Sequence, residues 1–340
     1  MALRELATRL QAPADDRPEW LRRRGAGWRV VAGKELVDAL TSVRFGVLFI
    51  ILALAAAAPV YVTGGAIRDA AQQASGAPAV FLALFTIGRD PVPSFVGLIG
   101  FLAPLLGIAF GFDAINAERA QGTLPRLVSQ PIHRDDVING KFAAGLAAIA
   151  VTLLAMMMIV AGIGLLRLGI VPTLSEVVRM LAWLIVTILY VGLWLAFATL
   201  CSVLFRRAAT SALLSIGVWL ALSLFGVLLA QLLAGVISPG TAGAGIEDQL
   251  AHSRLEQQLA SLSPSTLYQQ LTGVLLDPGQ TIIGVPGIAQ LAQFQQQIPT
   301  QLSLDQSLLL AWPQVVVLVA LTIVCFAGAY VGFLRQEIRA

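Results

Sequence analysis

The residue types that most often carry chemistry are few in this 340-residue chain and poorly placed for it. There are two histidines, His133 and His252, and two cysteines, Cys201 and Cys325. A metal centre needs several such ligands grouped together. Both cysteines fall inside long apolar blocks, where a thiol behaves as a small apolar group. The sequence also lacks an HExxH helix and a GxSxG elbow. We therefore expect neither a metal site nor a nucleophilic active site in this chain.

Nucleotide hydrolysis by the chain itself is not predicted either. A phosphate-binding loop of the form GxxxxGK[ST] is absent. The pairs Gly33-Lys34 and Gly140-Lys141 lack both the earlier glycine and the following Ser or Thr. The chain is thus not expected to be an enzyme on its own.

The composition is that of a membrane protein. Hydrophobic residues make up 57% of the chain and charged residues 12%, about half of the ~25% usual in soluble domains. The mean hydropathy is +0.82, and the apolar residues are gathered into blocks, so lipid is the expected solvent. The net charge of +3 is too small to argue for nucleic acid, and no such partner is expected.

Six blocks without Asp, Glu, Lys, Arg or His are long enough to cross about 30 Å of hydrocarbon as helices. The sequence thus predicts an all-α protein with six transmembrane helices, five of them within residues 45–237. Six spans place both ends of the chain on one side of the membrane. The predicted spans are Phe45–Val62, Val92–Phe112, Phe142–Leu166, Met180–Phe205, Ala208–Ile237 and Trp312–Leu334.

Lys and Arg residues set the orientation, because they are enriched in cytoplasmic segments. With the N-terminus in the cytoplasm, 17 of the 22 Lys and Arg residues fall in inner segments. We therefore expect a multi-pass protein of the cell membrane with cytoplasmic N and C termini. The outer segments hold Arg68, Arg89, Arg167, Arg179 and Arg254.

Residues 1–44 form the predicted cytoplasmic N-terminal segment. From Trp28 onward, apolar residues such as Leu36 and Leu40 recur at helical spacing, and Lys34 and Glu35 lie on another face. This pattern predicts an amphipathic helix along the inner membrane surface. A plain extension of the first span into the cytosol is the alternative.

Residues 113–141, between the second and third spans, are too many for a simple turn. Gly122 permits a sharp break, Thr123 can cap a helix through its hydroxyl, and Pro125 suits a first turn. We expect one short helix over residues 124–129, held below the membrane between two continuous helices. Its apolar side chains need a partner to cover them: Leu124, Leu127 and Val128.

Residues 238–311 form a long outer segment with a Gly-rich start and Gln-rich helical patches, among them residues 264–276. We expect short amphipathic helices that fold back on the outer ends of the spans as a lid. A flexible glutamine-rich loop is the alternative. The sixth span and the cytoplasmic C-terminus follow in residues 312–340.

Two classes of transport protein are open at this point. Ion-coupled secondary transporters and channels normally keep ionisable side chains within the membrane. The six blocks have none, which makes that class the alternative. The blocks do hold two small-residue pairs, Gly107 with Gly111 and Gly328 with Gly332. Such pairs let helices approach closely, between subunits or within one.

The segment between the second and third spans resembles the signature of the permease subunits of ABC type-2 transporters. The signature residues are Asp113, Glu118, Gly122, Thr123, Leu124, Pro131, Ile132, Arg134, Gly140 and Lys141. The resemblance extends to the Lys34-Glu35 pair, the run Phe101–Phe112 and the closing stretch Phe333–Ile338. It is closest to the branch that includes permeases linked to multicopper enzyme maturation, a branch with many exporters of unknown cargo. His133 departs from the pattern, in which a helix-capping serine is frequent there.

The resemblance implies a dimer of six-span permeases, identical or homologous, in the inner or plasma membrane of a prokaryote. Two separate ATPase subunits would bind ATP and Mg, this chain would bind no cofactor, and the short helix would dock in a groove on the ATPase. The cargo would be apolar or amphipathic, although an assembly or signalling role would leave the same sequence.

The resemblance also assigns roles to charged residues of this segment. Glu118 and Arg119 would lie where a charge network passes the movement of the ATPase to the spans. Arg126 and Arg134 would face the ATPase or lipid phosphates. Ordinary anchoring of these charges at the membrane interface is the alternative.

Overall fold

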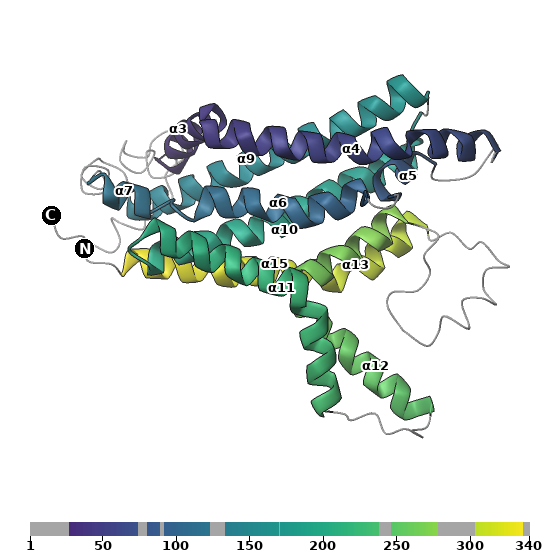
Figure 1. Ribbon diagram of the computed structural model, residues 1–340. Coiled ribbons are helices and arrows are strands. Elements are labelled where there is room, and N and C mark those ends of the chain that lie inside the picture. Colours follow the sequence, from purple (N-terminus) through teal and green to yellow (C-terminus); the bar gives the residue numbers. More distant parts are fainter. Residues whose placement is uncertain are drawn as a thin grey trace, which may run out of the picture.

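The computed structural model describes residues 27–73, 80–88, 92–122, 133–169, 171–237, 246–277 and 303–335. These residues form a bundle of long helices running side by side (Figure 1). The elements are α3 (Gly27–Thr41), α4 (Val43–Gln73), α5 (Val80–Thr86), α6 (Phe95–Gly111), α7 (Asn116–Ala120), α9 (Arg134–Ile163), the π-helical turn η2 (Gly164–Leu168), α10 (Leu174–Leu204), α11 (Ala208–Ile237), α12 (Ile246–Ala260), α13 (Pro264–Leu276) and α15 (Leu304–Leu334).

Six helices of the described residues are long and apolar enough to cross a membrane. The predicted all-α architecture with six spans is thus confirmed. Four spans begin before the predicted charge-free blocks. The first runs through Arg44, the third through Asp135, Asp136 and Lys141, and the fourth through Glu176 and Arg179, while the sixth begins at Leu304. The candidate spans are Val43–Gly65, Phe95–Ala120, Arg134–Arg167, Leu174–Leu204, Ala208–Ile237 and Leu304–Leu334.

Helix α10 is the centre of the bundle. Most of its side chains are buried, whereas α4, α11 and α15 leave most of their apolar side chains exposed. It begins with a capping box, in which the Thr173 hydroxyl accepts from the backbone N–H of Glu176 and the Glu176 carboxylate accepts from the backbone N–H of Thr173. The exposed apolar surface of the outer helices is the surface that lipid covers in a membrane protein.

Glycines of α6 allow this helix to lie against the backbone of α10. A Cβ atom on Gly107 would sit 2.5 Å from the carbonyl oxygen of Val191, and one on Gly111 would sit 2.7 Å from the Cβ of Ala198. Gly328 and Gly332 of α15 also face α10, through the side chains of Leu200 and Val203. Both small-residue pairs therefore serve packing within the chain.

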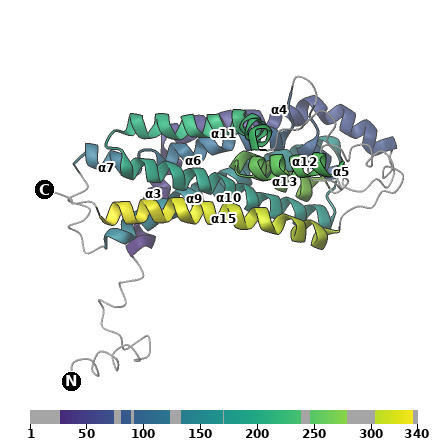
Figure 2. The ribbon, with the colours of Figure 1, turned by 90° about the horizontal axis from the view of Figure 1, so that it is seen from below.

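The two ends of the bundle are built differently. Helices α3 and α7, the start of α9, the turn between α10 and α11 and the last turn of α15 lie at one end, which we call the α7 end (Figures 1 and 2). Helices α5 and α13 lie toward the opposite end, which we call the α5 end. Helix α13 packs among α10, α11 and α15, and its Tyr268 ring stacks on Tyr190 of α10 with centroids 4.5 Å apart.

Helices α11 and α12 form a hairpin that leaves the bundle sideways (Figure 1). Its corner with α13 is fixed on α11, because the hydroxyls of Ser263 and Ser265 both donate to the carbonyl oxygen of Leu222. Ser263 also lies against Gly226, where a Cβ atom would be 2.9 Å from the serine Oγ. Beyond this point the buried residues of α11 are Ala230 and Ala234, which follow Gly226 at helical spacing.

Candidate coupling site

One lysine joins three helices at the α7 end. The Nζ atom of Lys141, on the first turns of α9, lies 2.9 Å from Oε1 of Glu35 on α3 and 3.2 Å from Oε1 of Glu118 on α7. The lysine side chain is only 10% exposed, and the two glutamates are 22% and 15% exposed. An ammonium group shielded from water between two carboxylates holds them more strongly than a surface pair would. We call these three residues the Lys141 cluster.

The close approach of α3 to α9 depends on the residue before Lys141. A Cβ atom on Gly140 would lie 2.7 Å from Cβ of Val31 and 2.8 Å from the carbonyl oxygen of Trp28. Val31 is the buried residue of α3, while Val30 and Val37 on the other side of the helix are exposed. Helix α3 therefore packs Val31 against α9, and its exposed side mixes apolar residues with the charged Lys34 and Asp38.

Two further contacts attach the end of α6 to its neighbours. Arg44, near the start of α4, donates to the carboxylate of Asp113. The Ser202 hydroxyl of α10 accepts from the backbone N–H groups of Ile115 and Asn116, at 3.1 and 3.2 Å. The first turn of α7 is thus hydrogen-bonded directly to the central helix, and a displacement of α7 acts on α10.

The structure reaches only part of the predicted coupling segment. Glu118 and Arg119 lie on α7, and Arg134 is the first residue of α9. Gly122 follows α7 with φ +65°, a left-handed conformation that favours glycine and breaks the helix direction there. The predicted site residues outside the described residues are Thr123, Leu124, Pro125, Arg126, Leu127, Val128 and Pro131. The predicted residues of the interfacial helix all lie on α3: Lys34, Glu35, Leu36 and Leu40.

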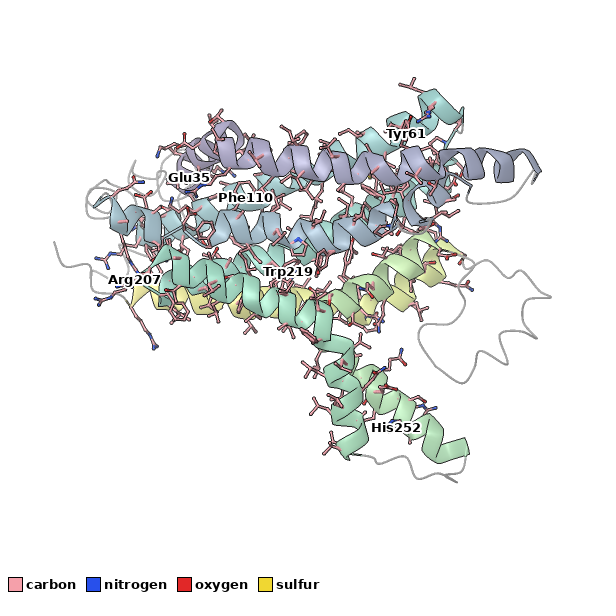
Figure 3. All side chains as sticks on the ribbon, in the orientation of Figure 1. Glu35, Tyr61, Phe110, Arg207, Trp219 and His252 are labelled. Atoms are coloured by element: carbon pink, nitrogen blue, oxygen red, sulfur yellow. The ribbon has the colours of Figure 1, made fainter. Side chains whose placement is uncertain are left out.

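Basic residues mark the same end of the bundle. Figure 3 shows Glu35 and Arg207 at the α7 end, Tyr61 toward the α5 end and His252 on the α11–α12 hairpin. Arg206 and Arg207 are exposed in the turn between α10 and α11. Among the described residues toward the α5 end, the basic side chains are few and acidic residues accompany them. Asp277 and Asp305 are two of these acidic residues. In the part of the chain that the structure describes, no group of three or more His, Cys, Asp or Glu residues is placed to hold a metal ion.

Sequence reasoning missed a second polar cluster, near the start of α10. Arg179, 6% exposed, donates to the carbonyl oxygen of Leu275 on α13 and to the hydroxyl of Ser307 on α15, both at 3.1 Å. Glu176, 4% exposed, accepts from the backbone N–H of Phe81 at the start of α5. Arg179 was expected in an outer segment, and the structure shows that Arg179 and Glu176 together fasten α5, α13 and α15 to the central helix. No local pattern predicts this, because the partners are far apart in the sequence.

Comparison with known proteins decides the family. The profile described as ABC-2 family transporter protein matches residues 29–338. The chain belongs to the ABC-2 transporter family. It is also 31% identical, over 163 residues, to the probable ABC transporter permease protein NosY of Stutzerimonas stutzeri. That alignment covers 46% of this chain and 56% of the relative, so the chain spans little more than half the length of the relative it matches.

Family membership agrees with the arrangement at the α7 end. As an ABC-2 permease, the chain is a multi-pass membrane protein, in keeping with the six apolar helices of the described residues. Three of the residues that carry the sequence resemblance, Glu35, Glu118 and Lys141, meet in one cluster. The cluster lies beside the segment that carries the family signature, so it is the candidate coupling site of this ABC-2 permease.

Proposed function

We propose that this chain is the permease subunit of an ABC exporter, and that it moves an apolar or amphipathic substrate with ATP hydrolysed by separate ATPase subunits docked at the α7 end. ATP and Mg would be held by the ATPase, and this chain would bind no cofactor. The observation that carries the proposal is the Lys141 cluster, which joins the interfacial helix, the signature segment and the third span through one shielded ammonium group.

The distribution of charge supports a cytoplasmic position for the α7 end. Lys and Arg residues concentrate in segments that remain in the cytoplasm. The residues near this end include Arg44, Arg206, Arg207 and Arg335, together with Lys141. The chain would then have cytoplasmic N and C termini in the inner or plasma membrane of a prokaryote.

The packing indicates how a movement of the ATPase would reach the spans. Docking on residues 123–132 would pull on α7 and on the start of α9. Because Ser202 is bonded to the first turn of α7, and Gly107 and Gly111 seat α6 on the backbone of α10, we expect α6 and α10 to move as one body. Packed helix pairs shift between discrete arrangements more readily than they deform. A tilt of this body against the outer helices would open a path for substrate.

The α11–α12 hairpin supports a dimer of permeases. The far half of α11 exposes large apolar side chains, including Leu232, Val236 and Ile237 at 60%, 79% and 62%. Helix α12 beside it is polar and carries Arg254 and Glu256. Contact with lipid is unfavourable for the polar and charged side chains of α12, and contact with water is unfavourable for the apolar side chains of this half of α11. In a dimer with a second copy of the chain, or with a homologous permease, the apolar faces of the two α11 helices would pack against each other. The two polar α12 helices would then line a water-filled space.

The experiment that tests the proposal is reconstitution in vesicles with and without an ATPase. The chain should catalyse movement of an amphipathic test compound only with the ATPase and hydrolysable ATP. Uptake driven by an ion gradient in vesicles that hold this chain alone would overturn the proposal in favour of a secondary transporter.

A further inference from the structure

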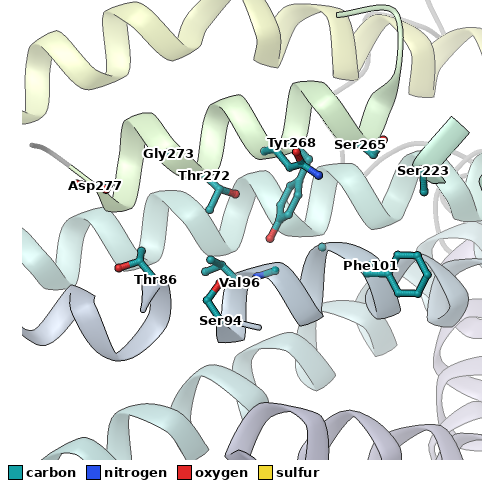
Figure 4. Close-up of a pocket in the computed structure, with 13 residues that line it drawn as sticks. Thr86, Ser94, Val96, Phe101, Ser223, Ser265, Tyr268, Thr272, Gly273 and Asp277 are labelled. Atoms are coloured by element: carbon teal, nitrogen blue, oxygen red, sulfur yellow. Dashed lines mark hydrogen bonds between the residues drawn. The ribbon is translucent and has the colours of Figure 1, made fainter. Parts of the chain in front are cut away.

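A cavity of about 300 Å³ lies between α5, α6, α11 and α13, away from the coupling site. Figure 4 shows its lining side chains along α13, with Asp277 at one end and Phe101 and Ser223 at the other. Its volume is at the lower limit for sites that hold drug-sized molecules. Between the ends the wall is made largely of hydroxyl and amide side chains: Thr86, Ser94, Ser265, Tyr268, Gln269 and Thr272.

One end of the cavity is negatively charged for two independent reasons. Asp277 is the C-cap residue of α13, and its backbone N–H donates to the carbonyl oxygen of Gly273. The C-terminus of a helix carries a partial negative charge, which favours cations and disfavours a carboxylate. Among the described residues, the Asp277 side chain has no hydrogen bond or ion pair. The half-buried Asp277 carboxylate therefore lies next to the partial negative charge of the helix C-terminus. A cation bound beside it would reduce this repulsion.

The described residues of the walls contribute no opposing charge. Burial raises the pKa of the Tyr268 phenol to about 12, so this side chain is neutral at physiological pH. The Thr272 hydroxyl accepts a hydrogen bond from Nε1 of Trp183, and the Tyr268 hydroxyl lies 3.2 Å from that of Thr187. Tyr268 is held by stacking on Tyr190, and Gly100 leaves room for its ring against α6. The middle of the cavity is therefore rigid, neutral and able to form hydrogen bonds.

The other end offers an apolar contact beside an unused polar atom. Phe101 is 39% exposed and packs on the ring of Trp219, with centroids 5.0 Å apart. The Ser223 hydroxyl is shut off from solvent and has no hydrogen-bond partner among the residues that the structure describes. The Phe101 ring therefore supplies the apolar contact at this end, and the Ser223 side chain lies in the wall beside it.

We propose that this cavity binds a small amphipathic molecule with a cationic group of the ammonium type at Asp277 and an aromatic or apolar end against Phe101. Among the described residues that line the cavity, Asp277 alone is acidic and none is Lys, Arg or His, so the cavity has one charged end and one apolar end. The inference rests on the proposed transport function, and it narrows the substrate class from amphipathic compounds to amphipathic cations.

Binding of ethidium, a permanently charged aromatic cation, tests this on the full chain in phosphatidylcholine nanodiscs, with empty nanodiscs as background. We expect saturable binding, competition by benzyltrimethylammonium, and no competition by its uncharged isostere neopentylbenzene. Asp277→Asn should weaken binding at least tenfold. Asp305→Asn, which removes the same charge from an exposed position at the start of α15, should leave it within twofold.

A second variant tests the opposite end without touching the carboxylate. Ser223→Leu fills the space beside Phe101 and should abolish binding, while the melting temperature shows that the variant is folded. Absence of saturable binding to the wild-type chain, equal competition by both isosteres, or equal affinity of Asp277→Asn and Asp305→Asn would each overturn the assignment. The assay contains no ATPase, so its failure is separate from a failure of ATP-driven transport.

Discussion

The ammonium group of Lys141 lies 2.9 Å from the carboxylate of Glu35, across the contact between α9 and α3. Its second partner, Glu118, brings α7 into the same cluster. Removal of the lysine charge leaves two carboxylates facing each other with little water, at a cost of about 1–3 kcal/mol. We therefore predict that Lys141→Met lowers the melting temperature and reduces substrate movement per ATP hydrolysed by the complex.

The control for this variant is Lys34→Met. Lys34 pairs with Asp38 one turn along α3, at 3.6 Å, and both side chains are more than 60% exposed (68% and 62%). Exposed pairs of this kind contribute little. Lys34→Met should therefore behave as wild type in both measurements, and an equal loss in the two variants would show that the Lys141 cluster has no special role.

Coupling can also be broken without removing the protein from the membrane. Glu118→Gln keeps the shape of the side chain but weakens its contact with Lys141, and Leu127→Pro interrupts the short helix expected over residues 124–129. Both variants should reach the membrane in normal amounts and lose at least tenfold of ATP-driven transport. Normal transport by both would contradict the role given to residues 113–141.

The seating of α6 on α10 gives a prediction about stability. Gly107→Ala places a Cβ atom 2.5 Å from a backbone oxygen of α10, so the helices must separate, at a cost of about 1–3 kcal/mol. Gly217→Ala on α11 meets no atom within 4 Å and should raise stability by up to about 1 kcal/mol through helix propensity. Thermal unfolding in one detergent compares the two variants directly. A melting temperature of Gly107→Ala at or above that of Gly217→Ala would be inconsistent with this packing.

The proposed dimer surface can be tested by cross-linking. With Cys201 and Cys325 replaced by alanine, a single cysteine at Val236 on α11 should form a disulfide-linked dimer in membranes under mild oxidation. A cysteine at Val324 on α15, which is 68% exposed, should not. Preferential cross-linking through Val324 would place the second permease on the other side of the bundle.

The six spans could be predicted from the sequence because charged side chains are unfavourable in lipid, so a membrane-spanning helix appears as a long block without them. The ends of the helices could not. A charged residue at the membrane surface can continue a helix, as Asp135 and Asp136 do on α9, and hydropathy gives no sign of it. Arg179 shows the same limit, since its partners Leu275 and Ser307 lie 96 and 128 residues away and only packing brings them together.

The candidate site was predictable in its members but not in its geometry. Resemblance to the permease signature singled out Glu35, Glu118 and Lys141, which the structure places on three different helices. That one lysine joins both glutamates depends on Gly140, which allows α3 to approach α9. The residues that line the cavity beside Asp277 carried no motif, because side chains contributed by four separate helices form no pattern along the sequence.

The most direct measurement of the central claim is copurification. The tagged chain is expressed with an ATPase that has a phosphate-binding loop and is encoded beside it, and the ATPase retained by the purified chain is quantified. We predict that wild type and Lys34→Met retain equal amounts of ATPase, in equal numbers of the two subunits, and that Leu127→Pro retains none. Absence of the ATPase from the purified wild-type chain, or equal retention by Leu127→Pro, would contradict the account.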